Sequence, residues 1–408
     1  MKELSDKIEG VLNATSMQRW YYNIYKNAKD PRTLMMDLEF VFSGTIDIDI
    51  LRKAWNLVLK KYPMLRTGFH ETKDHELFQV IYKEAHVEFE SASEAGNRDK
   101  KRIDLQTPPL FRLYLTPKDS DEFSLRWYFP VLLMDGWNVP ILYKDLLYYY
   151  SAYYAGKNSG VALASCSMKK YILYQRNRDK SDDERFWKNY FSSAESMTSP
   201  QVEDALDVDY QRLDISLSDL EQKIRENAKK IGVSLNCVFQ LSYMLALAQL
   251  QNKKDVYSRT TVADRPLSIK NIHNLVGLYI NEIPIRLSVS NRPFPEMAKE
   301  LQRDMNQLFS HVSSSLSEIS SYVGIQNLME IDNTITFENM PMEEIDYSSL
   351  PFSLTRTNFA NHPYGKINVF VWPNKGMNLK LLYDAKTYSL EAMTRFGNRI
   401  RESLDVNL

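Results

Sequence analysis

The feature that most constrains this chain is an apolar run, LRWYFPVLLM, which stops at Asp-Gly-Trp (residues 125–137). A strand whose two faces are both buried reads as such a near-continuous run. Aspartate and glycine are typical turn residues, and a carboxylate at the end of a buried strand also marks the edge of a site. The run therefore predicts a strand from Trp127 to Met134 that ends at a turn or a functional site.

The segment before this run predicts alternating strands and helices. LEFVFSGTIDIDILRKAWNLVLKKYPMLRTGF (residues 38–69) reads as a strand, a turn, an amphipathic helix and a second strand. The helix ends at Pro63, because proline cannot continue it. Its apolar face is formed by residues that recur at helical spacing, namely Leu51, Trp55, Val58 and Leu59.

The second half repeats this mixed style. It contains a strand interrupted by Pro284, which argues against a regular central strand, and a hairpin around Asn374 to Gly376. Two similar halves predict a pseudo-duplicated α+β protein with a cleft between two lobes. We expect an N-terminal lobe at residues 1–167, a connecting helix region at 168–204 and a C-terminal lobe at 205–408.

Length and composition narrow the function classes. The chain has 408 residues, a formal net charge of -1 and 44% hydrophobic residues, which suits large buried cores and disfavours a nucleic-acid binder. Its two cysteines, Cys166 and Cys237, offer neither a disulfide framework nor metal-ligand spacing, so we expect no metal site. The N-terminus lacks an apolar signal region and no run approaches a membrane span, so we expect a cytoplasmic protein without membrane contact.

Taken in order, several short motifs resemble the condensation domains of nonribosomal peptide synthetases, within the wider chloramphenicol-acetyltransferase-like fold. The resemblance covers nearly the whole chain. The motifs are NATSMQRWYY (13–22), KYPMLRTGF (61–69), PVLLMDGW (130–137), RFWKNYF (185–191), TTVADRP (260–266), VGLYINEIPIRL (276–287), SSSLSEIS (313–320) and FENMP (337–341).

This resemblance implies two lobes that form a V around a central cleft or tunnel. In the family, carrier proteins deliver acyl or aminoacyl thioesters on phosphopantetheine arms, and an amine attacks the thioester. No cofactor is therefore expected to be bound to the chain itself. The resemblance also implies that Asp135 is structural and pairs with Arg66, and that Trp137, Asn281, Ser315 and Asn339 contact substrate.

The chain departs from the family at its active-site motif, His-His-x-x-x-Asp-Gly. Pro130 and Val131 stand where the two histidines belong, and neither can accept a proton. The catalytic candidates that remain are Asp135, Gly136 and His362, which precedes Pro363 in a segment that runs along the tunnel in relatives. A lone histidine is more often a surface or hydrogen-bonded residue than a base.

Charged residues mark a second departure. Arg259 and Asp264 occupy places where the family usually has glycine, and Glu282 replaces a small polar residue. One interpretation is drift in loop residues. The other is that these charges line the tunnel wall and change what passes through it.

Two hypotheses of function follow. The first is a stand-alone condensation enzyme of secondary-metabolite biosynthesis, an acyltransferase-type catalyst acting on carrier-tethered groups without the usual histidine base. The second is an inactive condensation-like scaffold that binds carrier proteins or recruits a tailoring enzyme. Both imply a monomer that contacts carrier proteins and other synthetase components.

Overall fold

The computed structural model describes residues 6–90, 101–118, 121–157, 167–194, 207–338, 346–374 and 376–405. The chain forms two units, and each is assembled from three separate segments. Unit 1 comprises Met1–Arg178, Arg265–Tyr279 and Met340–Pro363, and unit 2 comprises Asp179–Asp264, Ile280–Asn339 and Tyr364–Leu408. The α+β class is confirmed, but the units differ from the contiguous lobes expected from the sequence, because two segments of the second half fold with the first.

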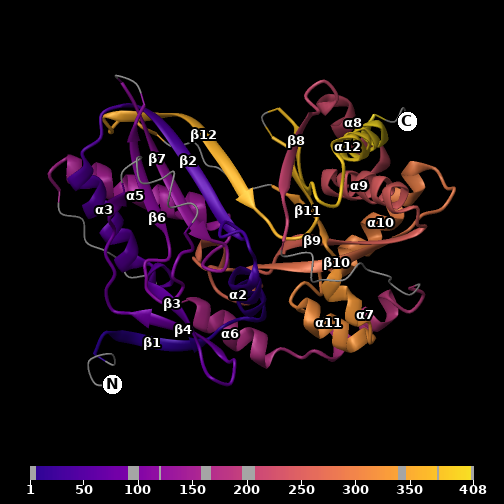
Figure 1. Cartoon of the computed structure of the whole chain (residues 1–408), viewed down its shortest axis with the longest axis horizontal. Helices are drawn as coiled ribbons and strands as arrows, with labels where there is room; N and C mark the ends of the chain where they lie inside the picture. Colours follow the sequence, from indigo (N-terminus) through magenta and orange to yellow (C-terminus); the bar gives the residue numbers. More distant parts are fainter. Residues whose placement is uncertain are drawn as a thin grey trace. The chain divides into compact units, whose positions relative to one another are not determined.

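Unit 1 contains strands and helices from all three of its segments (Figure 1). They are β1 (Ile8–Asn13), α2 (Ser16–Asn27), β2 (Met35–Gly44), α3 (Ile48–Lys61), the short 3-10 helix η1 (Pro63–Arg66), β3 (Thr67–Glu71), β4 (Leu77–Tyr82), β5 (Phe89–Glu90), β6 (Arg112–Pro117), β7 (Glu122–Pro130), α5 (Asn138–Tyr154), α6 (Ser167–Asn177), the 3-10 helix η3 (Ile272–Asn274) and β12 (Phe352–His362).

A five-stranded sheet in the order β12-β2-β7-β6-β5 dominates unit 1. Figure 1 shows β12, from the C-terminal half, running beside β2, and the two strands pair antiparallel from Phe352 opposite Gly44 to His362 opposite Met35. Helix α3 begins where the Asp47 carboxylate accepts the amides of Asp49 and Ile50. The predicted apolar face of this helix is confirmed, since Leu51, Trp55, Val58 and Leu59 are all buried.

One face of this sheet is apolar and packs against helix α3. The Trp55 indole of α3 lies edge-on to Trp127 of β7, with ring centroids 5.1 Å apart. The other face carries polar pairs, and Arg126 of β7 donates to both carboxylate oxygens of Asp37 on β2, at 2.6 and 2.5 Å. Strand β7 is therefore covered on both faces, as the apolar run predicted.

The predicted strand from Trp127 to Met134 is wrong at its C-terminal end, because β7 stops at Pro130. Pro130 pairs with Met35 on one neighbouring strand, β2. The other neighbour, β6, pairs with β7 only as far as Tyr128, so Pro130 has no strand partner among the described residues on that side. Proline is tolerated at such a position because its missing N–H breaks few ladder bonds. Residues 131–134 form a turn, in which the Leu133 amide donates to the Pro130 carbonyl at 3.0 Å.

Unit 2 contains the remaining elements of the described chain. They are α7 (Ser181–Tyr190), β8 (Tyr210–Ser216), α8 (Glu221–Ile231), α9 (Leu235–Gln251), β9 (Asp255–Ala263), β10 (Ile280–Ser288), α10 (Phe294–Leu308), α11 (Leu316–Val323), the 3-10 helix η4 (Gln326–Glu330), β11 (Asn333–Phe337), β13 (Ile367–Trp372), β14 (Asn378–Asp384) and α12 (Leu390–Leu404).

Helix α9 forms the centre of unit 2. Apolar residues occupy nearly every side of this helix, and α8, α10 and α12 pack against it. The unit's sheet has six strands in the order β10-β9-β11-β13-β14-β8. Strand β10 lies at the edge of this sheet, which accommodates Pro284 within a regular strand. The predicted hairpin is confirmed as β13 paired antiparallel with β14.

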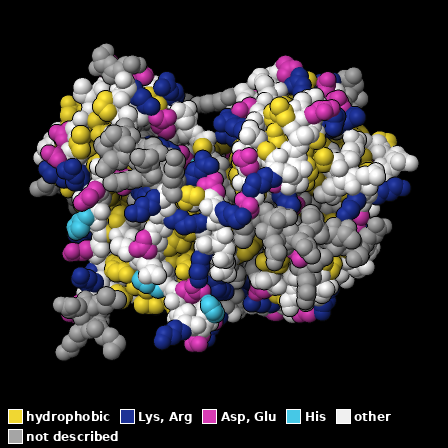
Figure 2. All heavy atoms as spheres, viewed as in Figure 1, with side chains coloured by type: hydrophobic (Ala, Val, Ile, Leu, Met, Phe, Trp, Pro, Cys, Tyr) yellow, Lys and Arg dark blue, Asp and Glu magenta, His cyan; other side chains and the backbone are white. Residues whose placement is uncertain are grey.

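Two further expectations concern membranes and cysteines. Among the described residues no single helix is long and apolar enough to cross a membrane, although the bent pair α8 and α9 together passes that test of length and composition. Cys237 is a buried free thiol, and Cys166 lies outside the described residues. Basic, acidic and apolar side chains are interspersed over the face drawn in Figure 2.

Candidate functional site

The Asp135 carboxylate lies in the turn between β7 and α5, inside unit 1. Its residue is 1% exposed. The turn is held locally, since the amides of Asn138 and Val139 donate to the carbonyls of Asp135 and Gly136 at 3.1 Å each. The sequence places a small residue, Gly136, between the carboxylate and the helix. The turn thus directs a carboxylate inward at the end of a buried strand.

Four hydrogen bonds satisfy this carboxylate. Arg265 Nη2 donates to Asp135 Oδ1 at 2.9 Å and to Oδ2 at 3.1 Å. The Tyr279 amide donates to Oδ2 at 2.8 Å, and Asn138 Nδ2 donates to Oδ1 at 2.6 Å. A buried carboxylate requires this kind of pairing. All four bonds lie within unit 1.

Arg265 is itself fixed from several sides. Its Nη1 donates to the carbonyls of Ile272 and Leu275 at 2.9 and 3.2 Å. Its guanidinium carbon lies 4.8 Å from the ring centroid of Tyr279 and 5.7 Å from that of Trp137. Arginine suits this position because its planar fork binds a carboxylate while the remaining donors reach carbonyls.

The expected pair of Asp135 with Arg66 is wrong. Arg66 instead forms an ion pair with Glu9 at 2.7 Å and donates to the carbonyls of Leu59, Tyr82 and Lys83. These partners hold the Arg66 guanidinium near the start of β3, away from Asp135. The arginine that neutralises Asp135 comes from the TTVADRP motif, whose role in this site the sequence reasoning missed.

The hydrogen bonds around Asp135 favour a structural role for this residue. Burial raises the pKa of its carboxyl, whereas the Arg265 guanidinium and the Tyr279 amide act in the opposite direction. Every strong donor nearby favours the charged form, and the carboxylate oxygens already accept four bonds. Asp135 is therefore poorly suited to exchange a proton with a substrate.

Asn138 and Trp137 join the same cluster. The Asn138 side chain donates to the Gly277 carbonyl at 2.8 Å and accepts from the Gly277 amide at 3.1 Å. The Trp137 indole donates to the His273 carbonyl at 3.2 Å and is partly exposed. Helix α5 is thus tied to residues 265–279 by side chains at its first turn. A substrate contact of Trp137 stays a prediction.

Pro130 and His362 end two strands of the five-stranded sheet, β7 and β12, and Val131 directly follows Pro130. The Leu34 carbonyl accepts the Val131 amide at 2.8 Å, and the Leu34 amide donates to the His362 carbonyl at 2.6 Å. Leu34 itself has a φ of 60°, an uncommon conformation for a residue with a side chain. The backbone of one residue therefore connects the two segments.

The sheet register puts the His362 and Pro130 side chains on one face. His362 stands opposite Met35, and Met35 stands opposite Pro130. Directly opposed residues share a face. Two strand spacings separate the backbones of His362 and Pro130 by about 10 Å. His362 is thus a histidine of unit 1 that the fold brings to the end of β7.

The imidazole of His362 is partly buried. Burial lowers its pKa, and the positive charges of Arg32 and Arg126 act in the same direction against Asp37 and Asp30. A neutral imidazole is the form that can accept a proton. The residue is therefore chemically able to act as a base, although its role stays a prediction.

Asn281 and Ser315 lie in unit 2, where both have structural partners. Asn281 Nδ2 donates to the carbonyls of Val312 and Ser314, at 2.7 Å each, and thereby holds the turn before α11. Ser315 caps α11 and forms a capping box with Glu318. Their predicted contact with substrate stays a prediction. Asn339 lies outside the described residues.

A second histidine, His311, is fixed in unit 2. Its Nδ1 lies 2.7 Å from Asp183 Oδ1, and its ring stacks on Phe186 with centroids 4.1 Å apart. The other carboxylate oxygen of Asp183 accepts from Ser314 Oγ at 3.0 Å. The carboxylate lies between histidine and serine, so this serine is not hydrogen-bonded to the imidazole as a nucleophile would be.

Arg259 and Glu282 form a buried ion pair. Arg259 Nη1 lies 3.1 Å from Glu282 Oε2, and their side chains are 0% and 5% exposed. Tyr364 completes the group, because its hydroxyl donates to Glu282 Oε2 at 2.8 Å and its ring centroid lies 4.2 Å from the Arg259 guanidinium carbon. The two residues belong to strands β9 and β10, so the interpretation of drift in loop residues is wrong for both.

Within the described residues, no group of three His, Cys, Asp or Glu side chains is arranged to hold a metal ion.

Comparisons with known proteins agree with the motif order. The family model "Condensation domain" matches residues 8–406. The chain is 25% identical over 403 residues to gramicidin S synthase 2 of Brevibacillus brevis, covering 92% of this chain and 9% of that protein. It is also 25% identical over 376 residues to chondramide synthase cmdD of Chondromyces crocatus, covering 88% of this chain and 10% of that protein. The chain thus spans only a small part of these relatives.

Solved structures give the same fold. The condensation domain from the monacolin K polyketide synthase MokA matches with a TM-score of 0.79 at 14% identity, covering 98% of this chain and 97% of that one. The X-domain from teicoplanin biosynthesis matches with a TM-score of 0.78 at 15% identity, covering 96% of this chain and 94% of that one. The chain belongs to the condensation-domain family.

Proposed function

We propose that the chain binds acyl or aminoacyl groups tethered to carrier proteins and promotes amide formation between them by positioning, without a histidine at residues 130 and 131. The arrangement around Asp135 supports this proposal. The carboxylate, Arg265 and Asn138 hold the turn after β7 in a fixed form, yet residues 130 and 131 carry no titratable group.

Positioning alone can supply much of the rate. Holding two thioesters together replaces a bimolecular encounter, and effective molarities of about 10⁵–10⁸ M are known for well-oriented intramolecular reactions. A general base contributes roughly 10²–10⁴-fold, so its loss slows a reaction without abolishing it. In the proposed reaction the amine nitrogen forms the amide bond, the carbon–sulfur bond breaks, and the amine proton leaves to the thiolate or to His362.

Intact-mass measurement of carrier proteins tests the proposal directly. One carrier is loaded with an acyl group and another with an aminoacyl group, and the mass of each is followed with and without the protein. Transfer of the acyl mass onto the aminoacyl carrier, dependent on the protein, supports amide formation. Unchanged masses with carriers that demonstrably bind would contradict it.

Two variants separate the mechanisms. Val131→Ala is expected to cost less than the roughly 10²-fold that loss of a general base costs, because Val131 transfers no proton. His362→Gln tests the remaining histidine on the shared face, and a loss larger than that of Val131→Ala would assign it the proton transfer. Equal small losses would leave positioning as the mechanism.

A scaffold without catalysis is the second candidate. The observation in its favour is that Asp135, an acidic group at the end of β7, is fully engaged by four hydrogen bonds from three donor groups. The X-domain of teicoplanin biosynthesis, which shares this fold, has been solved in complex with OxyB. Binding of carriers without any change in their masses would favour this candidate.

A further inference from the structure

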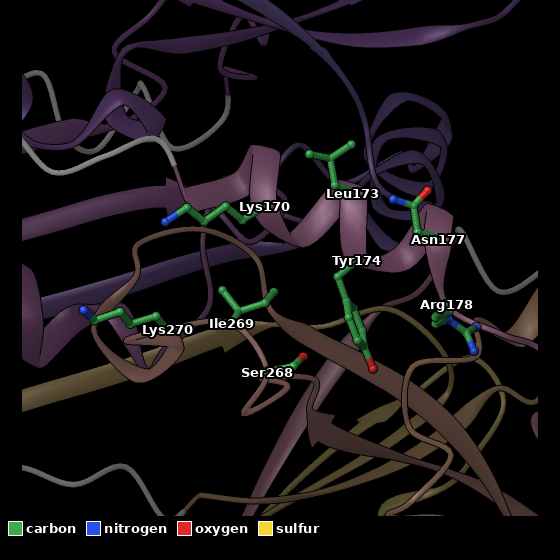
Figure 3. A pocket seen from close by; sticks show the side chains of 8 residues that line it. All are labelled: Lys170, Leu173, Tyr174, Asn177, Arg178, Ser268, Ile269 and Lys270. Carbon is green, nitrogen blue, oxygen red and sulfur yellow. The ribbon is translucent and has the colours of Figure 1, made fainter.

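An open groove on unit 1, with a volume of about 530 Å³, lies between helix α6 and the turn at residues 266–270 (Figure 3). Helix α6 contributes Lys170, Leu173, Tyr174 and Asn177, and Arg178 directly follows the helix. The turn contributes Ser268, Ile269 and Lys270. Lys170, Tyr174 and Arg178 recur every four residues, so they share one side of the helix. Figure 3 shows Tyr174 extending from the helix toward the side of Ser268, whereas Arg178 lies at the end of the helix and points away from the turn.

The groove is positively charged. Lys170, Arg178 and Lys270 line it, and none of the eight described lining residues carries a carboxylate. The two segments that form it, residues 167–178 and 265–279, contain no aspartate or glutamate at all. The whole chain has a net charge of -1, so this local surplus is a property of the surface and not of the composition.

The lysine charges are available to a partner. Lys170 and Lys270 are exposed, and neither forms an ion pair with another described residue. Ser268 and Asn177, which are also exposed, add a hydroxyl and an amide as hydrogen-bond donors. Arg178 is oriented by a bond from its Nε to Gln175 Oε1 at 3.1 Å. Exposed cations of this kind attract an anionic partner over a distance set by the ionic strength.

Exposed leucines distinguish a protein partner from a small anion. Leu173 in the groove is 44% exposed, and Leu267, next to Ser268, is 84% exposed. Both are large apolar side chains left in solvent beside a set of cations. Large apolar side chains exposed beside polar and charged ones are typical of a protein–protein interface. Steering charges then bring the partner to it.

We infer that this groove docks the acidic face of a carrier protein, with the carboxylates of that face and the phosphate of its phosphopantetheine arm meeting Lys170, Arg178 and Lys270. The inference rests on the proposed function, because that function requires a carrier whose phosphopantetheine arm contains an anionic phosphate. It adds the surface on which one carrier binds, which neither the motifs nor the site around Asp135 identifies.

Binding titrations with charge-reversal variants test the groove. The probes are holo-carrier domains from gramicidin S synthase 2 and chondramide synthase cmdD, added to the whole chain. Lys170→Glu with Lys270→Glu is expected to weaken binding about 10-fold or more and to flatten its salt dependence. The matched control is Lys53→Glu with Lys73→Glu, which reverses two exposed lysines elsewhere in unit 1 and is expected to change affinity less than about 2-fold.

The outcomes separate the groove from the proposed function. If the parent protein binds no carrier in the panel, the proposed function and the groove both fail. If the parent binds and the two double variants bind equally well, the groove is wrong while the proposed function stands. Apo-carriers, which lack the arm, distinguish the two sources of negative charge. Weaker binding of the apo form assigns part of the attraction to the phosphate, and equal binding assigns it to the acidic face.

Thermal unfolding of both double variants shows whether either change disturbs the fold. Leu267→Ser provides a second route to the same conclusion, because it removes an exposed apolar side chain beside the groove without changing any charge. Its expected effect is weaker binding with an unchanged salt dependence. A carrier affinity unaffected by Leu267→Ser together with one unaffected by the lysine reversals would overturn the inference.

Discussion

Arg265 holds Asp135 across 130 residues of sequence, with Nη2 at 2.9 Å and 3.1 Å from the two carboxylate oxygens. Both side chains are almost fully buried, at 3% and 1% exposure. This ion pair fastens the turn after β7 to the segment that returns to unit 1 from the second half of the chain. It makes the end of β7 depend on residues that follow it far along the sequence.

Removing Asp135 is therefore expected to destabilise the fold strongly. Asp135→Ala leaves a buried guanidinium without its counter-charge, and breaking a buried pair in this way costs on the order of 3–5 kcal/mol. Asp135→Ala with Arg265→Met is expected to recover part of the loss, since neither charge then remains. Asp135→Ala with Arg66→Met is the control and is expected to recover none. Denaturant unfolding curves compare the four proteins, and rescue by the Arg66 change instead would contradict the assignment.

The buried ion pair of Arg259 and Glu282 predicts that substitutions of these two residues have coupled effects on the stability of unit 2. Glu282→Leu removes the counter-charge of Arg259, whose side chain is 0% exposed. We therefore expect the free energy of unfolding to fall by about 3–5 kcal/mol. Adding Arg259→Met is expected to restore much of it. Tyr364→Phe removes a hydrogen bond to a charged group and is expected to cost about 1.5–3 kcal/mol. Urea unfolding measures each value, and additive losses in the double variant would show that the two residues act independently.

His362 predicts a pH dependence of stability. Burial lowers the pKa of its imidazole below the ordinary value of 6.5, so the unfolded chain takes up a proton before the folded chain does. Stability is unaffected above the ordinary value and decreases as the pH falls through it, until the folded pKa is also passed. His362→Gln is expected to reduce this decrease between about pH 7 and about pH 5. Melting temperatures across that range test the sign, and an equal slope in parent and variant would contradict it.

The backbone at Gly44 predicts that the contact between β2 and β12 contributes to the stability of unit 1. It has a φ of +110°, and a Cβ there would lie 2.3 Å from the Pro351 carbonyl oxygen. Gly44→Ala is therefore expected to cost about 1–3 kcal/mol in backbone strain and more in displacement of β12. Gly232→Ala is the control, because its φ of +82° brings similar strain while a Cβ there meets nothing within 4 Å. A smaller loss for Gly44→Ala than for Gly232→Ala in thermal unfolding would show that β12 yields easily.

Local patterns predicted the elements well and the long-range pairs poorly. The apolar face of α3 follows from the spacing of Leu51 and Trp55, and the hairpin of β13 and β14 follows from turn residues between two apolar runs. The partner of Asp135 does not follow from any spacing, because Arg66 and Arg265 both lie within family motifs and only the fold decides between them. Arg259 and Glu282 each read as an isolated charge, and their pairing needs the register of β9 and β10.

The interleaved composition of unit 1 has a consequence for synthesis on the ribosome. The Thr355 side chain of β12 binds the Val41 carbonyl of β2 across 314 residues, which at ~5–20 residues per second means a delay of roughly 15–60 s. During that interval the nascent chain carries β2 as an open sheet edge and a carboxylate at residue 135 whose arginine has yet to emerge or has only just emerged. An open edge of this kind invites pairing with other chains. The β2 edge of the first half of the protein therefore lacks its partner until β12 has been translated.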